Sequence, residues 1–144
     1  MIARLQQFWT LSLIAGLAWW CWRVWPQSPA WALAGLAWAG LCHALVIGTQ
    51  FVCMHRINRE DAAPRARWPA LLRAWWAEAG AMLVVFCWRQ PFRSASCPDW
   101  LPATPTGRRG VVLVHGFLCN RGVWLPWMAP LRAGGHAFVA VSLE

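Results

Sequence analysis

The chain has 144 residues, of which 59% are hydrophobic, and its formal net charge is +8. Soluble domains are usually about 45–50% apolar, so this composition argues against an ordinary soluble domain. Fourteen residues are tryptophan, whose ring is stable at a membrane–water interface, although all thirteen basic residues are arginine and biased codon usage would also fit. The densest arginines directly follow an apolar run, which is typical of topology signals, so we expect a lipid bilayer and no nucleic acid as partner.

The six cysteines form no C-x-x-C pair and show no zinc-site spacing. Three of them lie in apolar runs, so we expect scattered apolar thiols and neither a disulfide framework nor a metal site. No cofactor is expected. The cysteines are Cys21, Cys42, Cys53, Cys87, Cys97 and Cys119.

The first apolar segment extends from about Leu5 to Trp22, with Arg23 at its end. At ~1.5 Å per residue it just spans a hydrocarbon core of ~30 Å. A cleaved signal peptide is the alternative, but tryptophans occupy the region where a small-x-small cleavage site would lie, and they also argue against a lipoprotein role for Cys21. We therefore predict an uncleaved membrane anchor.

The second apolar segment extends from about Ala30 to Met54, and Pro26 and Pro29 separate it from the first. Two prolines this close end one helix before the next begins. Residues 1–56 are therefore predicted to form a transmembrane hairpin of two helices.

Small residues and one histidine stand out in the second segment. Gly40, Ala44 and Gly48 recur at four-residue spacing, which favours close approach of the first segment, although such residues are also common in membrane helices. His43 lies near mid-span. We expect it to be neutral and bonded to the neighbouring helix, in preference to a functional ionisable site, because neither span contains an acidic residue.

Arginines predict the orientation of the hairpin, because they favour the cytoplasmic side. Arg4 precedes the first segment, a cluster follows the second, and the connector holds only Arg23. Both termini are therefore expected in the cytoplasm, at a bacterial inner membrane. The cluster consists of Arg56, Arg59, Arg65, Arg67 and Arg73.

Residues 57–90 contain a third segment with two interpretations. Ala70–Trp88 includes Arg73 and Glu78, and its uninterrupted apolar part, Ala79–Trp88, is too short to span. We favour an interfacial helix, which its tryptophans suit; a third span would move everything after it across the membrane. These tryptophans are Trp68, Trp75, Trp76 and Trp88.

The stretch from Arg89 to Gly110 is rich in proline, serine, threonine and arginine, and residues 91–110 are predicted to be an extended linker. Its prolines exclude regular structure across it, and the change in composition marks a domain boundary. They are Pro91, Pro98, Pro102 and Pro105.

Residues 111–144 have the pattern of a strand–helix–strand unit, which implies a parallel sheet. The first strand is β-branched, the helix is shortened or broken by Pro126 and Pro130, and two glycines end it. The predicted elements are a strand at Val111–Val114, an N-cap at Asn120, a helix at Arg121–Arg132, a C-cap at Gly134 and Gly135, and a strand at His136–Leu143.

The sequence VVLVHGFLCNRGVW at Val111–Trp124 resembles the α/β-hydrolase family in its strand, His-Gly-Phe turn and following tryptophan. The resemblance covers residues 111–144. It implies that the backbone N–H of Phe117 is one oxyanion-hole donor and that His115 and Gly116 shape the turn. Gly116 would let a substrate approach the backbone, and His115 is not assigned as a catalytic base. The expected fold class is a membrane α-helical hairpin plus an incomplete α/β unit, the truncated start of a hydrolase sheet.

No G-x-S-x-G nucleophile motif is present: Ser142 lacks flanking glycines, and Cys119 lies on the oxyanion loop itself. We therefore expect the N-terminal part of a membrane-anchored serine hydrolase of ester or lipid acyl groups, inactive without its nucleophile. One alternative is a non-enzymatic integral membrane protein, transporter-like or an interaction fragment, in which the His-Gly-Phe match is accidental. Another is a frameshift or pseudogene product without function.

Overall fold

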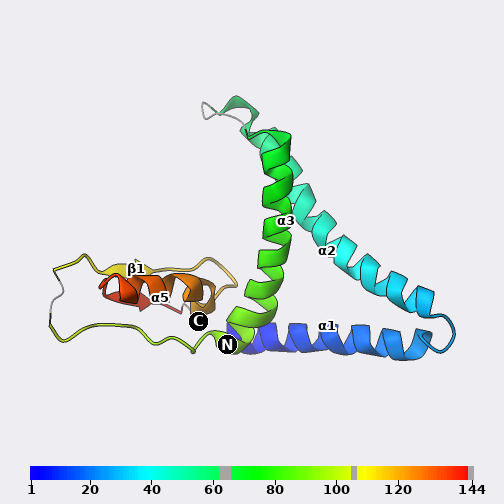
Figure 1. The fold of residues 1–144 in the computed structure, drawn as a ribbon, viewed down its shortest axis with the longest axis horizontal. Helices are drawn as coiled ribbons and strands as arrows, with labels where there is room; N and C mark the ends of the chain where they lie inside the picture. Colours follow the sequence, from blue (N-terminus) through cyan, green and yellow to red (C-terminus); the bar gives the residue numbers. More distant parts are fainter. Residues whose placement is uncertain (62–65, 105–106, 143–144) are drawn as a thin grey trace. The chain divides into compact units, whose positions relative to one another are not determined.

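The computed structural model describes residues 1–61, 66–104 and 107–142, and these are mostly helical with a small two-stranded sheet (Figure 1). Contacts divide the chain into two compact units. The helical unit comprises Ser12–Met82, and the sheet unit comprises Met1–Leu11 together with Leu83–Glu144. Apolar helices and a small parallel α/β piece are thus both present, as predicted, whereas the division into four consecutive segments stays a prediction.

Helices α1 (Ile2–Val24) and α2 (Pro29–Ile57) lie on either side of the predicted proline break. Ser28 caps α2, since its hydroxyl oxygen accepts a hydrogen bond from the N–H of Trp31 at 3.3 Å. Pro29 occupies the first helical position, where its missing N–H costs nothing. Residues at the proline break therefore determine locally where α2 begins.

The end of α1 contacts α2 through one indole ring. The Nε1–H of Trp20 donates to the carbonyl of Ala32 at 3.3 Å. Gly35 lies against the same ring so closely that a Cβ at this position would overlap it. The glycine that accommodates α1 is therefore Gly35.

The third helical run is longer than predicted. It begins with helix α3 (Trp68–Val84) and continues through a π-helical turn, η2 (Val85–Arg89), into α4 (Gln90–Arg93). The expectation that Pro91 excludes regular structure was wrong: Pro91 is buried in α4. A proline ring normally clashes with the carbonyl four residues before it. The π-helical turn places a wider i→i+5 spacing immediately before the proline, which relieves this clash.

Helices α2 and α3 form an antiparallel pair. The Nε1–H of Trp75 donates to the carbonyl of Ala44 at 2.7 Å, and a Cβ added at Gly48 would lie 3.2 Å from the same ring. The Nε2–H of His43 donates to the carbonyl of Ala79 at 3.0 Å, as expected for a histidine bonded to a neighbouring helix. Ala44 and Gly48 therefore pack against α3, whereas the first segment was predicted to be their partner.

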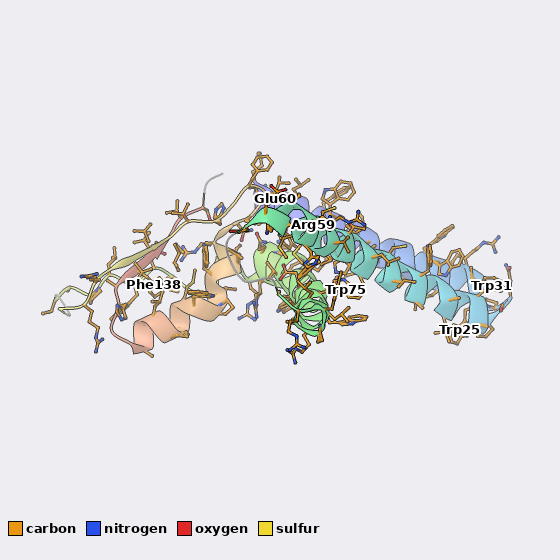
Figure 2. All side chains as sticks on the ribbon, turned by 90° about the horizontal axis from the view of Figure 1, so that it is seen from above. Trp25, Trp31, Arg59, Glu60, Trp75 and Phe138 are labelled. Atoms are coloured by element: carbon orange, nitrogen blue, oxygen red, sulfur yellow. The ribbon has the colours of Figure 1, made fainter. Side chains whose placement is uncertain are left out.

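Among the residues that the structure describes, two helical runs are long and apolar enough to cross a membrane, Pro29–Glu60 and Trp68–Arg93. The first run includes a 3-10 turn, η1 (Asn58–Glu60), after α2. The third apolar segment, for which an interfacial helix was favoured, is therefore long and apolar enough to span a membrane. In Figure 2, Trp25 and Trp31 lie at the connection between α1 and α2, and Arg59 and Glu60 lie at the connection that follows α2.

The sheet unit contains the predicted parallel strand pair. Strands β1 (Val111–Leu113) and β2 (Phe138–Ala140) pair with Val112 opposite Val139. A 3-10 turn, η3 (Arg121–Trp124), and helix α5 (Leu125–Ala133) connect them. A right-handed strand–helix–strand connection is the usual way to join parallel strands, and this unit confirms the sequence pattern.

The elements differ in length from the predicted ones. β1 ends one residue early, and the helix begins as the 3-10 turn η3 because Pro126 favours the first turn of an α-helix. Gly135 has φ of +73°, the left-handed conformation that ends a helix, so the predicted glycine C-cap is confirmed. The predictions for Arg65, for Pro105 and for the end of the second strand at Leu143 concern residues outside the described ranges.

A small apolar core holds the sheet unit together. α5 packs against the strands (Figure 1), and Leu113, Met128, Phe138 and Ala140 are buried between them. The predicted linker also contributes, because Trp100 pairs with Phe138 in an isolated antiparallel bridge. Part of the proline-rich stretch is therefore fixed to the edge of the sheet.

Candidate oxyanion loop and its support

The loop after β1 closes as a tight turn. The N–H of Cys119 donates to the carbonyl of Gly116 at 3.2 Å, and Leu118 has φ of +59°. A positive φ at the third residue of a β-turn defines type II, where glycine is usual. Leucine there costs of order 1 kcal/mol, so the surrounding structure must hold the turn in place.

Phe117 occupies the second position of this turn. Its side chain is 93% exposed, and its N–H has no hydrogen-bond partner within the described part of the chain. A Cβ added at Gly116 would meet nothing within 4 Å. The peptide between these residues therefore borders open space, as an oxyanion-hole donor requires; the role itself stays a prediction.

His115 is buried beside the turn. Its Nδ1 lies 2.9 Å from the carbonyl oxygen of Gly116, and because a carbonyl only accepts, Nδ1 is the donor in this contact. The imidazole thus bonds to its own loop. This geometry fits the predicted role in shaping the turn.

An apolar cavity of about 460 Å³ lies against the loop within the sheet unit. Residues His115 to Leu118 form one side. Met1, Ile2 and Leu5, from the start of α1, form the other. Hydrocarbon groups in this cavity would lie directly beside the Phe117 amide.

Two buried amide side chains, which the sequence did not indicate as partners, hold the residues after the loop by hydrogen bonds. Asn120 is 1% exposed and Gln90 is fully buried. The Asn120 N–H donates to Oε1 of Gln90 at 2.7 Å, and its Nδ2 donates to the Gln90 carbonyl at 3.0 Å. Oδ1 of Asn120 also accepts from the N–H of Gly122 at 2.8 Å, which confirms the predicted N-cap.

The start of α1 extends this network, in which the buried Nε2 of Gln90 has no hydrogen-bond partner among the described residues. Nε2 of Gln6 donates to the Leu118 carbonyl at 3.0 Å, and Oε1 of Gln6 accepts from Nδ2 of Asn120 at 3.2 Å. Nε2 of Gln7 donates to the Pro91 carbonyl at 2.7 Å. Both glutamines lie within the first predicted apolar segment. Their signal was available, since amides in an apolar helix need internal partners.

Gly122 is required by the close approach of η3 to the junction of η2 and α4. A Cβ there would lie 2.8 Å from the carbonyl oxygen of Arg89 and 2.9 Å from Cα of Gln90. Real Cβ atoms do not approach backbone this closely, so a larger residue would push η3 away from the helix end. The absence of a side chain at Gly122 therefore allows η3 to pack directly against the backbone of Arg89 and Gln90.

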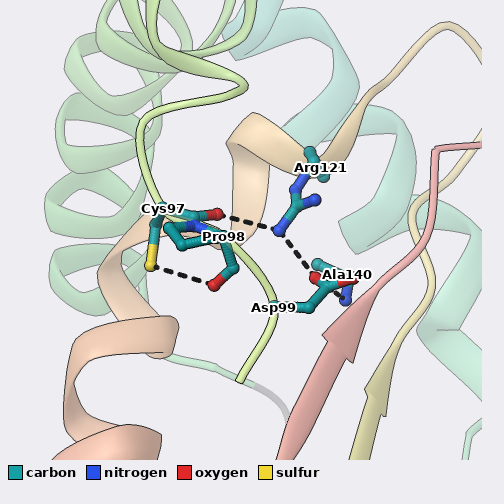
Figure 3. Close-up of polar contacts among 5 residues, drawn as sticks. All are labelled: Cys97, Pro98, Asp99, Arg121 and Ala140. Atoms are coloured by element: carbon teal, nitrogen blue, oxygen red, sulfur yellow. Dashed lines mark hydrogen bonds and ion pairs between the residues drawn. The ribbon is translucent and has the colours of Figure 1, made fainter. Parts of the chain in front are cut away.

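A second polar cluster fastens the linker to the sheet (Figure 3). Oδ1 of Asp99 accepts from a guanidinium nitrogen of Arg121 at 2.7 Å and from the N–H of Ala140 at 3.0 Å. The same guanidinium nitrogen donates to the Cys97 carbonyl at 2.8 Å. One carboxylate thereby connects the linker, η3 and β2.

Replacing Asp99 with alanine is expected to destabilise the sheet unit by about 1–3 kcal/mol, because the Ala140 amide and the Arg121 guanidinium lose a shared acceptor. Hydrogen–deuterium exchange at Ala140 should therefore quicken by about tenfold or more. Asp61→Ala, outside the sheet unit, is the control. Equal exchange at Ala140 in both variants would contradict this role.

Three further observations concern side chains that could bind a metal ion or act as nucleophiles. Within the described residues, no group of three or more His, Cys, Asp or Glu side chains is arranged to hold a metal ion. The cysteines are free thiols. Cys119 is half-buried at the end of the type II turn. It therefore lies in the same turn as the predicted donor Phe117, whereas a nucleophile would have to lie across the substrate carbonyl from that donor.

Comparison with protein-family models, with curated proteins and with solved structures finds no match to this chain.

Proposed function

We propose that this chain is the membrane-anchoring and oxyanion-loop part of an α/β-type serine hydrolase that acts on ester or lipid acyl groups. The observation that carries the proposal is the Phe117 amide, unpartnered within the described residues, in a strained turn at the carboxyl end of a parallel strand. Ligands of parallel α/β sheets bind beyond this end of the strands. The attacking serine is expected on a G-x-S-x-G motif outside these 144 residues.

The chemistry of the loop suits acyl transfer. Attack on an ester carbonyl places negative charge on its oxygen, and an amide already aimed at that position stabilises the charge without reorganisation. The apolar cavity beside the loop is large enough for part of an acyl chain. We therefore assign the donor role to Phe117 and positioning roles to His115 and Gly116.

Exposed apolar side chains support a membrane location for the helices. Trp38 and Trp76, for example, are each 63% exposed on α2 and α3. Large apolar patches on a helix pair are stable when lipid covers them. We propose that Pro29–Glu60 and Trp68–Arg93 are the two spans.

Two antiparallel spans leave the residues before α2 and after α4 on the same side of a bilayer. Because Gln6 and Gln7 bond to Gln90 and Pro91, the start of α1 belongs on that side too. A helix that begins and ends on one side does not span, so we propose that α1 lies at the interface, which its tryptophans favour. A bacterial inner membrane as the location is part of the proposal. Arg56, Arg59 and Arg67 lie at the other end of the two proposed spans, and the arginine rule that predicted cytoplasmic termini favours the cytoplasm for that end.

The proposal is tested by labelling membranes that contain the complete gene product with a fluorophosphonate, which reacts with activated serines. We expect covalent labelling of the protein that carries residues 1–144, and no labelling of residues 1–144 expressed alone. A complete product that retains its membrane anchor and is never labelled would favour the non-enzymatic alternative. Sodium carbonate washing measures the anchor separately, because embedded spans resist it.

A further inference from the structure

A second cavity, of about 470 Å³, lies between α2 and α3 in the helical unit. Its α2 wall includes Leu45, Gly48 and Val52, spaced along one helix face. Its α3 wall includes Leu71 and Trp75, again on one face. The cavity is therefore a groove that follows the helix pair, and it has the volume of a ligand site.

The inner part of this groove offers few polar contacts to a ligand. The hydroxyl of Thr49 already donates to the Val46 carbonyl at 2.7 Å, and the indole N–H of Trp75 donates to the Ala44 carbonyl at 2.7 Å. The remaining surface is aliphatic, aromatic and sulfur. A chain of methylene groups fits this lining, whereas a polar ligand would lose its hydrogen bonds to water.

A cation lies at the end of the groove. Arg56 is exposed, lines the cavity, and has no carboxylate partner within the described residues. Trp68 lines the same end, and its ring packs against His55 with centroids 4.9 Å apart. A guanidinium beside an indole is a common arrangement at the membrane–water interface, where both bind head groups.

The length of the groove matches one leaflet. From Leu45 to Arg56 the helix rises roughly 16 Å at ~1.5 Å per residue, about half of a ~30 Å hydrocarbon core. An acyl chain in the groove would thus reach mid-bilayer with its head group at Arg56. We propose that the α2–α3 groove binds one anionic phospholipid, its acyl chain against Trp75 and its phosphate on Arg56. This inference rests on the proposed membrane spans, and it does not depend on the hydrolase.

Native mass spectrometry of the full chain, released from nanodiscs of phosphatidylcholine and phosphatidylglycerol in a 3:1 ratio, tests the site. The wild type should retain one phosphatidylglycerol in preference to phosphatidylcholine. Arg56→Gln should lower this preference by about tenfold or more, because charge-assisted hydrogen bonds to phosphate are lost. Arg67→Gln removes the same charge nearby without lining the cavity, and it should leave the preference unchanged.

Val52→Trp, which fills the groove, provides a second variant and should reduce retention of either lipid. Helical circular dichroism confirms that each variant folds. Equal preference in wild type and Arg56→Gln, retention in Val52→Trp, or a dimer with no bound lipid would each overturn the site. Glycerol phosphate added alone should not bind, and binding would assign a phosphate site in place of a lipid site. Release of the chain by carbonate would instead reject the membrane spans.

Discussion

In the proposed hydrolase, replacing Phe117 with proline is expected to lower kcat for ester hydrolysis by about 10²–10³-fold, the usual loss of one oxyanion-hole donor. Proline removes the backbone N–H together with the exposed aromatic ring, whose loss the alanine control below measures separately. The second position of a type II turn is where proline is favoured, and Leu118, not Phe117, has the positive φ that proline could not adopt. The change should therefore remove a donor without unfolding the turn.

Phe117→Ala is the matched control, because it removes the exposed aromatic ring and keeps the N–H. Its kcat should stay within a few-fold of the wild type, while KM for long-chain esters rises if the ring contacts substrate. The measurement is the rate of p-nitrophenyl butyrate and p-nitrophenyl decanoate hydrolysis by both variants. Equal kcat in the proline and alanine variants would remove Phe117 from the oxyanion hole.

Local patterns in the sequence predicted the elements of the sheet unit well. Val111 and Val112 are β-branched, Asn120 has a side chain suited to an N-cap, and Gly135 adopts the left-handed conformation after α5. Each of these signals acts within a few residues. The parallel pairing with Phe138–Ala140 followed because a helix separates the two strands.

Contacts between distant segments were not predictable in the same way. Gln6 and Asn120 are 114 positions apart, and Gln90 is 30 positions from Asn120. Nothing in the local sequence states that an amide in one segment satisfies an amide in another. The requirement that buried amides have partners identifies the residues, but only the fold identifies the pairs.

The prediction for the small residues of α2 was wrong in its choice of partner helix. Sequence order suggested that Ala44 and Gly48 face the first segment, whereas Trp75 of α3 occupies this surface. Proline rules had also shortened the third segment, because they do not anticipate that the π-helical turn at Val85–Arg89 accommodates Pro91. The first error missed α3 as the packing partner of α2, and the second underestimated the length of the helical run that begins with α3.

Asn120→Ala is expected to destabilise the sheet unit by about 3 kcal/mol, the second large effect. The N-cap of η3 contributes about 1 kcal/mol, and loss of Nδ2 leaves acceptors on Gln6 and Gln90 without their donor in a buried site. Opening of the unit should become about 100-fold more frequent, at roughly 1.4 kcal/mol per tenfold. Hydrogen–deuterium exchange of residues 119–133 in the full chain measures this.

Two further variants separate the cap from the network. Asn120→Ser keeps an oxygen that caps η3 but cannot donate to Gln90 as the amide does, so its exchange should lie between wild type and alanine. Asn58→Ala, at the exposed end of α2, should leave exchange in residues 119–133 unchanged. If serine restores full protection, Asn120 is only a helix cap, and Gln6 and Gln90 do not support the loop. If serine and alanine exchange alike, the amide donors dominate, and the strained turn at Leu118 depends on an interaction with the first helix.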